Sequence, residues 1–353
     1  MPSQSHAPDA VTRWLTETRP ERLARLWTSA ERIRRAVVGD RVYLRGLIEV
    51  SNHCVRDCLY CGLRCGHGEL ERYRLTESQV LAAASRAADL GCGTIVLQSG
   101  EDPGLAAEDV ERLIRRLRSE LGVVVTLSLG ERSPEELARW REAGASRYLL
   151  KFETSDDALY RKLHPALAGP PQRLARLGTL RELGYEVGSG VMVGLPGQTW
   201  EILARDLALF RELDLDMIGV GPFLPHPSTP LGASPEPWAP PERQVPADEQ
   251  TTLKVVALSR LLCPEANIPS TTALATLDRH EGRELGLQRG ANVFMPNFTP
   301  SPYRERYEIY PGKAATTEGA AVDRAAIEEG LARIGRRLGE GRGDRERRRG
   351  VPS

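Results

Sequence analysis

Short apolar runs alternate along this chain with longer segments in which apolar residues recur every three or four positions. The short runs are typical of buried strands, and the longer spacing is typical of amphipathic helices. The predicted strands are Tyr43–Val50, Thr94–Gln98, Val123–Ser128, Arg147–Phe152, Glu186–Val193, Met217–Val220, Asn267–Ser270 and Ala291–Met295. The predicted helices between them are Glu77–Leu90, Ala107–Leu121, Pro134–Ala143, Asp156–Leu163, Gln172–Leu183, Trp200–Glu212, Asp248–Leu262 and Arg283–Arg289.

This alternation predicts the fold class. Strands that alternate with helices form parallel sheets with right-handed crossovers. Eight such units predict a closed α/β barrel of the (βα)8 TIM type over residues 41–338, rather than an open sheet. Residues 9–38 predict two helices that separate near Pro20, so residues 1–40 are interpreted as an N-terminal helical extension. Residues 339–353 are rich in Gly and Arg with few apolar residues to balance them, and they predict a disordered basic tail.

Composition narrows the class of protein. The chain has 353 residues, of which 41% are hydrophobic, enough for a large core. Its 48 basic and 48 acidic residues cancel, so no net field favours nucleic acid or a membrane as partner. No window is long and apolar enough for a transmembrane helix, and the first 20 residues lack the apolar centre of a signal peptide. We therefore expect a cytoplasmic protein whose thiols stay reduced.

A long proline-rich connection follows the sixth predicted strand. Residues 222–247 contain nine prolines, which exclude regular structure over most of the segment. A loop that covers the mouth of the barrel and a plain surface excursion are both open interpretations.

Three cysteines directly after the first strand are the strongest chemical signal. Cys54, Cys58 and Cys61 form a CxxxCxxC motif that offers three thiolates to one metal centre. A four-iron, four-sulfur (4Fe-4S) cube needs one ligand per iron, so three cysteines leave one iron open to another ligand. Tyr60 precedes the third cysteine, where its ring could pack on an adenine. The spacing favours an iron–sulfur site that binds S-adenosylmethionine (SAM) at its open iron.

The same cysteines are also compatible with a zinc site or a redox pair. Cys65 could complete a zinc tetrad, and His53 or His67 could supply nitrogen ligands. A redox pair of Cys58 and Cys61 is chemically possible, but it leaves Cys54 without a role.

Polar residues also end several of the other strands, where the working residues of a (βα)8 barrel lie. They are Gln98 and Ser99, Thr126, Lys151 and Glu153, Thr271 and Thr272, and Met295, which is apolar but follows the eighth strand. Because these strand ends meet at one rim, they predict a shared pocket.

The chain resembles the HydE-type maturases of FeFe-hydrogenase, which are radical SAM enzymes with a full (βα)8 barrel. The resemblance covers about Arg41 to Lys313. It rests on ordered blocks, which are Cys54–Arg64, Arg72–Thr76, Thr94–Pro103, Thr126–Glu131, Val193–Thr199, Gly221–Pro227, Ile268–Ala273, Asn292–Asn297, Pro300–Tyr303 and Tyr310–Lys313. Biotin synthase and the methylornithine synthase of pyrrolysine assembly are the nearest related families.

The resemblance implies a set of roles for these residues. Cys54, Cys58 and Cys61 would hold one 4Fe-4S cluster. The residues implied to contact SAM are Tyr60, Gln98, Ser99, Glu153, Arg173 and Tyr307. Those implied to line the substrate pocket are Thr126, Lys151, Thr271, Thr272 and Met295.

The resemblance also implies a reaction and partners. Reduction of the cluster would cleave SAM into methionine and a 5′-deoxyadenosyl radical, which would serve assembly of the di-iron subcluster of the hydrogenase H-cluster. The implied partners are a small organometallic substrate, an electron donor such as ferredoxin or flavodoxin, and companion hydrogenase maturases.

Two departures from the family pattern bear on these roles. The fourth strand ends in Lys151-Phe152-Glu153-Thr154, where the family typically has Arg-His-Glu-Thr. Lysine binds a carboxylate as a point charge and not as a two-pronged fork. A paralogue acting on another small amino-acid-like substrate, as methylornithine synthase or biotin synthase does, therefore stays open. No cysteine follows Cys263, so a single cluster is predicted.

Overall fold

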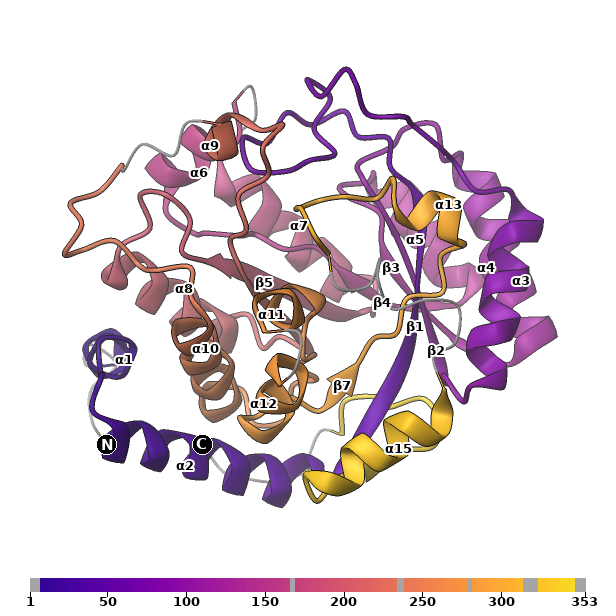
Figure 1. Cartoon of the computed structure of the whole chain (residues 1–353). Coiled ribbons are helices and arrows are strands. Elements are labelled where there is room, and N and C mark those ends of the chain that lie inside the picture. Colours follow the sequence, from indigo (N-terminus) through magenta and orange to yellow (C-terminus); the bar gives the residue numbers. More distant parts are fainter. Residues whose placement is uncertain (1–6, 166–168, 234–237, 279–280, 314–322, 347–353) are drawn as a thin grey trace.

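A computed structural model describes residues 7–165, 169–233, 238–278, 281–313 and 323–346 of the chain. Its centre is a curled parallel sheet (Figure 1). The sheet has the strand order β6-β5-β4-β3-β2-β1-β7. These strands are β1 (Arg41–Ser51), β2 (Thr94–Ser99), β3 (Val124–Ser128), β4 (Ala145–Leu149), β5 (Glu186–Val193), β6 (Met217–Pro222) and β7 (Val293–Phe294). A short strand β8 (Arg337–Leu338) pairs in parallel with the first residues of β1.

Residues 267–269 close the sheet between β6 and β7. The N–H of Ile218 donates to the carbonyl of Asn267, and the N–H of Asn292 donates to that of Ile268, at 3.0 and 2.9 Å. This seventh strand position is made of bridges and not of a full strand. Pro269 lies within it and has no N–H to donate, which explains the short pairing. The ring of parallel positions confirms the predicted (βα)8 barrel type.

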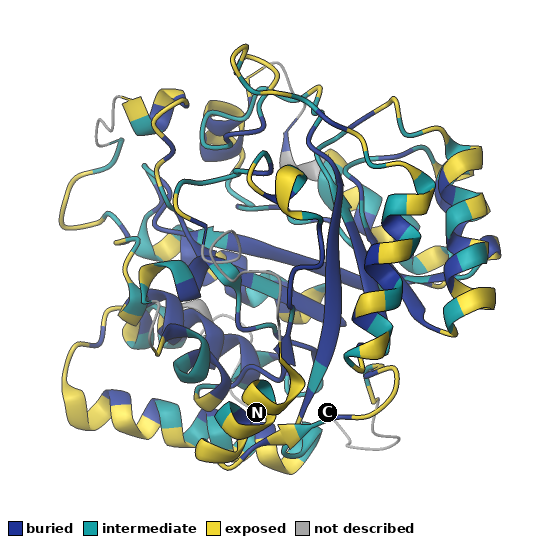
Figure 2. Cartoon of the chain, turned by 45° about the vertical axis from the view of Figure 1, so that its right-hand side comes forward, coloured by how far each residue is buried: buried dark blue, intermediate teal, exposed yellow. Residues whose placement is uncertain are grey.

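Helices surround the sheet, and Figure 2 shows the strands buried while the helices are exposed on their outer sides. The helices are α1 (Ala7–Leu15), α2 (Pro20–Val38), α3 (Glu77–Asp89), α4 (Ala107–Leu121), α5 (Pro134–Ala143), α6 (Asp157–Leu163), α7 (Pro170–Glu182), α8 (Trp200–Glu212), α9 (Pro230–Ala233), α10 (Glu249–Leu262), α11 (Thr272–Leu277), α12 (Gly282–Gln288), α13 (Ser301–Arg304) and α15 (Arg324–Arg333). None of the described helices is long and apolar enough to cross a membrane.

Local sequence explains several helix starts. Thr76 and Ser133 form capping boxes with Gln79 and Glu136, which satisfy free N–H groups at the first turns of α3 and α5. At the N-terminus, α1 packs against α8 and α10, and α2 packs against α10. The division of the chain into a separate extension and a barrel stays a prediction.

The fourth strand is shifted from its predicted position. The apolar run up to Phe152 predicts a strand at residues 147–152, whereas β4 ends at Leu149. The chain then turns, and Glu153 adopts a left-handed backbone with φ of 61°. Apolar residues continue past the strand because Leu150 and Phe152 are buried below the turn.

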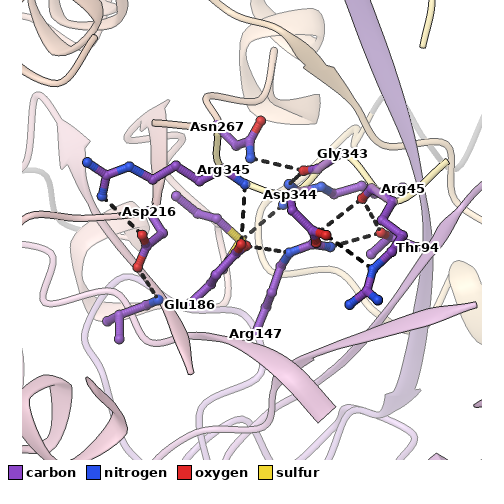
Figure 3. A network of polar contacts seen from close by, with 12 residues as sticks. Arg45, Thr94, Arg147, Glu186, Asp216, Asn267, Gly343, Asp344 and Arg345 are labelled. Carbon is purple, nitrogen blue, oxygen red and sulfur yellow. Dashed lines mark hydrogen bonds and ion pairs between the residues drawn. The ribbon is translucent and has the colours of Figure 1, made fainter. Parts of the chain in front are cut away.

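The C-terminal segment differs from the expected disordered tail. Residues 339–346 lie across the N-terminal end of the barrel, as Figure 3 shows for residues 343–345. The carbonyl of Gly343 accepts hydrogen bonds from Arg45 and Asn267, at 3.3 and 3.1 Å. Asp344 forms an ion pair with Arg147, whose side chain is fully buried. Buried cations on the strands need acceptors, and this polar segment supplies them. Residues 347–353 of the predicted tail lie outside the described residues.

Candidate functional site

The cysteine motif lies in a long loop between β1 and α3, at the C-terminal end of the barrel. Asn52 donates from Nδ2 to the carbonyls of Glu71 and Arg306, at 3.0 and 2.9 Å, and its Oδ1 accepts from the N–H of Tyr73 at 2.7 Å. Arg72 donates to the carbonyls of Asn52, Leu63 and Arg64 at 2.6 to 2.8 Å. Two side chains therefore fold the loop back on itself and fix its shape.

The three thiols of the motif face the same buried region. The Sγ of Cys54 accepts N–H groups of Arg56 and Glu101, each at 3.4 Å. Cys54 and Cys61 also pack against a small apolar cluster that includes Tyr307. Burial raises the pKa of all three thiols, that of Cys61 to about 12, and the other two thiols raise the pKa of Cys58 further. Cys54, Cys58 and Cys61 are each partly buried in this loop.

Two features of the structure bear on the zinc alternative. Across the described ranges of the chain, no three His, Cys, Asp or Glu side chains are placed to hold one metal ion. Cys65, the candidate fourth zinc ligand, is exposed on the outside of the loop. A 4Fe-4S cube binds each thiolate through a different iron and so spaces the sulfurs more widely than a tetrahedral zinc does. The three cysteines remain the predicted ligands of such a cube.

Two later segments cover the cysteine loop. The N–H of Leu231, in α9, donates to the carbonyl of Leu59 at 3.1 Å. The N–H of Gly62 donates to the carbonyl of Ile309 at 3.1 Å. His226, from the proline-rich connection, lies 3.6 Å from a carboxylate oxygen of Glu308. The first part of that connection therefore lies at the mouth of the barrel, as one of its two interpretations expected.

A ring of four charged side chains lies beside Cys54. Arg56 is 2.5 Å from Glu101 and 3.9 Å from Glu131, and Arg173 is 2.9 Å from Glu131 and 4.0 Å from Glu101. All four side chains are largely buried, with at most 23% of the surface of each exposed. Two guanidinium groups and two carboxylates are thus grouped beside Cys54.

Tyr60, Lys151 and Glu153 lie on another side of the motif. The hydroxyl of Tyr60 is 2.9 Å from Nε2 of His164. Burial raises the pKa of Tyr60, and the charges of neighbouring thiols and of Glu153 add to this effect, so the phenol stays neutral. Nζ of Lys151 is 3.0 Å from a carboxylate oxygen of Glu153, and the Lys151 carbonyl accepts from Arg173 at 3.0 Å. These predicted site residues are therefore brought together.

Gln98 and Tyr307 contact each other directly. Nε2 of Gln98 donates to the hydroxyl of Tyr307 at 3.3 Å, and Tyr307 is buried. The Lys313 ammonium lies 5.0 Å from the centre of the Tyr307 ring and forms a buried ion pair with Glu49. Ser99 follows Gln98 and donates to the carbonyl of Gly100 at 2.5 Å.

The remaining pocket candidates stand at other strand ends. Thr126 is buried on β3, and its Oγ1 has no hydrogen-bond partner among the described residues. Thr271 donates to the carbonyl of Val220 at 3.0 Å and caps α11, which Thr272 begins. Met295 directly follows β7 and is half-buried. Their role as a substrate pocket stays a prediction.

Sequence analysis did not single out Glu49, Lys313 or Asp206 as site residues. Glu49 interrupts an apolar strand, and Asp206 falls on the buried side of α8 next to Leu207. A charged residue on a buried face is costly without a partner, and this is the signal that could have found both acids.

Comparisons with known proteins agree with this geometry. The model of the Radical SAM superfamily matches residues 48–210. The chain is 46% identical over 322 residues to the FeFe-hydrogenase maturase subunit HydE of Thermotoga maritima, covering 91% of this chain and 89% of that protein. It is 30% identical over 276 residues to the 3-methylornithine synthase of Methanosarcina acetivorans, covering 77% and 74%. A crystal structure of methylornithine synthase (PylB) matches with a TM-score of 0.79 and 25% identity over 94% of each chain.

The match to HydE spans the cysteine loop, the strand ends and the barrel that carries them. The chain therefore belongs to the radical SAM superfamily and, within it, to the HydE-type FeFe-hydrogenase maturases, and it is an enzyme.

Proposed function

We propose that this enzyme holds one 4Fe-4S cluster through Cys54, Cys58 and Cys61, cleaves SAM reductively, and uses the 5′-deoxyadenosyl radical in assembly of the di-iron subcluster of FeFe-hydrogenase. The observation that carries the proposal is the CxxxCxxC loop that follows β1 at the C-terminal end of the barrel and packs Cys54 and Cys61 against one buried apolar cluster. The 46% identity to HydE supports the assignment to hydrogenase maturation.

Hydrogen bonds and charged side chains of the site act on the three cysteine thiols. Two N–H groups point at Cys54, and hydrogen bonds to a thiolate stabilise its charged form. Arg56 and Arg173 place positive charge nearby, although Glu101 and Glu131 offset it. Because burial raises the pKa of all three thiols, binding of the metal centre must drive their deprotonation.

The predicted cofactor residues offer the groups that SAM requires. SAM carries an ammonium, a carboxylate, a sulfonium and an adenine. Glu153 supplies a carboxylate for a cationic group, and the Arg173 guanidinium supplies paired donors for a carboxylate. Tyr60 supplies a neutral ring surface, while Gln98, Ser99 and Tyr307 supply neutral hydrogen-bonding groups. When bound, the cluster and SAM supply a one-electron cleavage of the sulfonium that releases the radical.

The barrel protects the chemistry. A primary radical abstracts hydrogen from C–H groups within reach, so mobile side chains must be kept away from it. Segments around Leu231 and Ile309 cover the cysteine loop, and residues 343–345 occupy the opposite end of the barrel. The substrate would be a small molecule or an organometallic complex, with ferredoxin or flavodoxin as electron donor and companion maturases as partners.

One observation favours a second candidate function. The Lys151 ammonium is bound to Glu153, so a single cation stands where the family typically has an arginine fork. A radical SAM enzyme acting on another small amino-acid-like substrate accommodates this difference, as the likeness to methylornithine synthase also allows.

Anaerobic reconstitution with iron and sulfide tests the first part of the proposal. We expect a brown protein that forms 5′-deoxyadenosine from SAM when a reductant is added. A colourless protein that binds one zinc ion would refute it.

A maturation assay tests the second part. Hydrogenase expressed with its companion maturases, in cells that lack their own HydE-type enzyme, should become active only when this chain is present. SAM cleavage without any gain in hydrogenase activity would favour the second candidate function.

A further inference from the structure

The backbone at Glu153 is strained at the point where this residue must face the cofactor. Among the residues that the structure describes, only Glu153 and Asp214 are non-glycine residues with positive φ. A left-handed conformation costs free energy for a side chain with a Cβ, and it persists only where the surroundings hold it. The contacts on both sides of Glu153 should therefore show what holds it.

Strand β5 holds the chain that leads into Glu153. The N–H of Leu150 donates to Gly188 at 2.9 Å, and that of Glu153 donates to Gly190 at 3.0 Å. Between them, the N–H of Phe152 donates to the hydroxyl of Ser189 at 3.2 Å. These contacts fix the position of Glu153 but leave the exit from the turn undetermined.

Asp206 holds the exit. Its Oδ1 accepts both the N–H and the hydroxyl of Ser155, at 2.7 and 2.5 Å. Thr154 turns back between them, and its N–H donates to the carbonyl of Phe152 at 2.7 Å. The backbone is thus held at Phe152 and at Glu153 itself, and again at Ser155, two residues after the strained position.

Burying the Asp206 carboxyl group costs free energy that few contacts offset. It lies on the fully buried side of α8, and its Oδ2 has no hydrogen-bond partner among the described residues. Burial raises its pKa to about 7, while hydrogen bonds from Ser155 and the nearby charge of Arg205 only partly offset this effect. In either protonation state Oδ1 accepts both bonds from Ser155, so the contact depends on the acceptor and not on the charge.

We propose that Asp206 is a positioning residue, which clamps Ser155 and thereby directs the Glu153 carboxylate toward bound SAM. The inference rests on the proposed role of Glu153 in SAM binding. Asp206 itself touches neither the cofactor residues nor the cysteine loop in its described contacts. It acts through the turn at residues 153–155, because that turn sets where the Glu153 side chain points.

Four variants of the anaerobic, cluster-loaded enzyme test the inference by equilibrium dialysis with SAM. Asp206→Leu keeps the branched shape, with a larger volume, but removes the acceptor, and we expect the dissociation constant to rise about tenfold with iron content unchanged. Asp206→Asn keeps Oδ1 and should stay within about twofold of the native enzyme. Ser155→Ala removes one of two donors, and we expect a rise of about threefold.

The fourth variant is the control. Leu207→Ala opens a cavity at the adjacent buried position of α8 without touching the turn, so it should lower the unfolding temperature and leave SAM affinity unchanged. Weaker binding in Leu207→Ala to the same extent as in Asp206→Leu would show that loosening α8 is sufficient, and the inference would be wrong. If Asp206→Leu does not fold, Ser155→Ala alone decides.

Glu153→Ala separates this inference from the proposed function. If Glu153→Ala weakens SAM binding while Asp206→Leu and Ser155→Ala do not, the positioning role falls and the proposed function stands. If Glu153→Ala binds SAM as tightly as the native enzyme, the cofactor role of Glu153 and the inference fall together. SAM cleavage by the native enzyme tests the proposed function independently of all these variants.

Discussion

Asp344 gives a carboxylate to the buried Arg147, and its replacement by alanine tests whether the C-terminal segment stabilises the barrel. Arg147 keeps three other partners in the variant. They are Glu186 at 2.7 Å, the hydroxyl of Thr94 at 2.9 Å and the carbonyl of Arg342 at 3.0 Å. The charge of Arg147 therefore stays compensated, and the loss is that of one charged contact.

The loss in free energy of unfolding depends on how exposed the Arg147 and Asp344 side chains are. A hydrogen bond to a charged group contributes about 1.5–3 kcal/mol, and removing the last partner of a buried charge costs about 3–5 kcal/mol. The Arg147 side chain is fully buried, but that of Asp344 is 44% exposed, so water can enter the vacated position. We expect Asp344→Ala to lower the free energy of unfolding by about 1–2 kcal/mol.

Two measurements check this expectation. Urea unfolding should show a lower midpoint with an unchanged slope, which indicates a change in stability and not in compactness. Hydrogen exchange should show slow exchange for the peptide that contains residues 343–346 in the native enzyme and faster exchange in the variant. The control is Asp109→Ala, which removes a carboxylate from an exposed pair with Arg112 on α4 and should change neither result.

Hydrogen exchange in the native segment as fast as in a flexible chain would contradict this expectation. That result would restore the interpretation of residues 339–346 as a disordered tail. An unchanged urea midpoint for Asp344→Ala would instead show that water replaces the carboxylate without loss.

Three further predictions follow from buried groups. Cys58→Ser should abolish cluster binding and SAM cleavage, whereas Cys65→Ser should spare both; iron content and 5′-deoxyadenosine decide, and the reverse pattern would overturn the ligand assignment. Lys313→Met should destabilise the enzyme by about 3 kcal/mol because it leaves Glu49 buried without its cation, and unfolding in urea measures this loss. Burial lowers the pKa of His164 to about 4 from its ordinary 6.5. The neutral ring therefore contributes stability that is present above pH 6.5 and is lost as the pH falls toward 4. His164→Phe should flatten the curve of stability against pH in that window, and an unchanged curve would contradict the assignment.

Much of the barrel could be predicted because its elements are specified locally. Helices such as Ala107–Leu121 and Trp200–Glu212 follow from apolar spacing, and β5 follows from its apolar run. Capping residues add sharp boundaries, as Ser133 does before α5. In these segments the pattern of the sequence and the packing of the barrel require the same structure.

The errors arise where distant partners decide the structure. Leu150 and Phe152 extend an apolar run, but regular β4 ends before them, since the chain bonds to β5 only at intervals and Ser189 and Asp206 bind the turn that follows. The segment at residues 339–346 has no apolar residues of its own, and it is ordered by cations of the barrel strands, such as Arg147. Neither set of partners can be found from local sequence.

The candidate site shows the same division. The spacing of the three cysteines predicts a cluster loop because all the ligands lie within eight residues. The charged ring beside Cys54 combines side chains from four separate segments, at Arg56, Glu101, Glu131 and Arg173. Sequence analysis named Arg173 by resemblance, but only the fold shows that its guanidinium is already bound to Glu131 and to the Lys151 carbonyl.

These contacts couple the position of Lys151 to the proposed cofactor site. Its ammonium binds Glu153, and its carbonyl binds Arg173, so both charged residues proposed to contact SAM touch this one lysine. An ammonium has three N–H donors, which allows it to bind Glu153 and an anionic group of the substrate at the same time. A substrate that draws Lys151 away from Glu153 would free that carboxylate for SAM. If Lys151 binds the substrate as proposed, replacing it should change the affinity for the substrate and the affinity for SAM in concert.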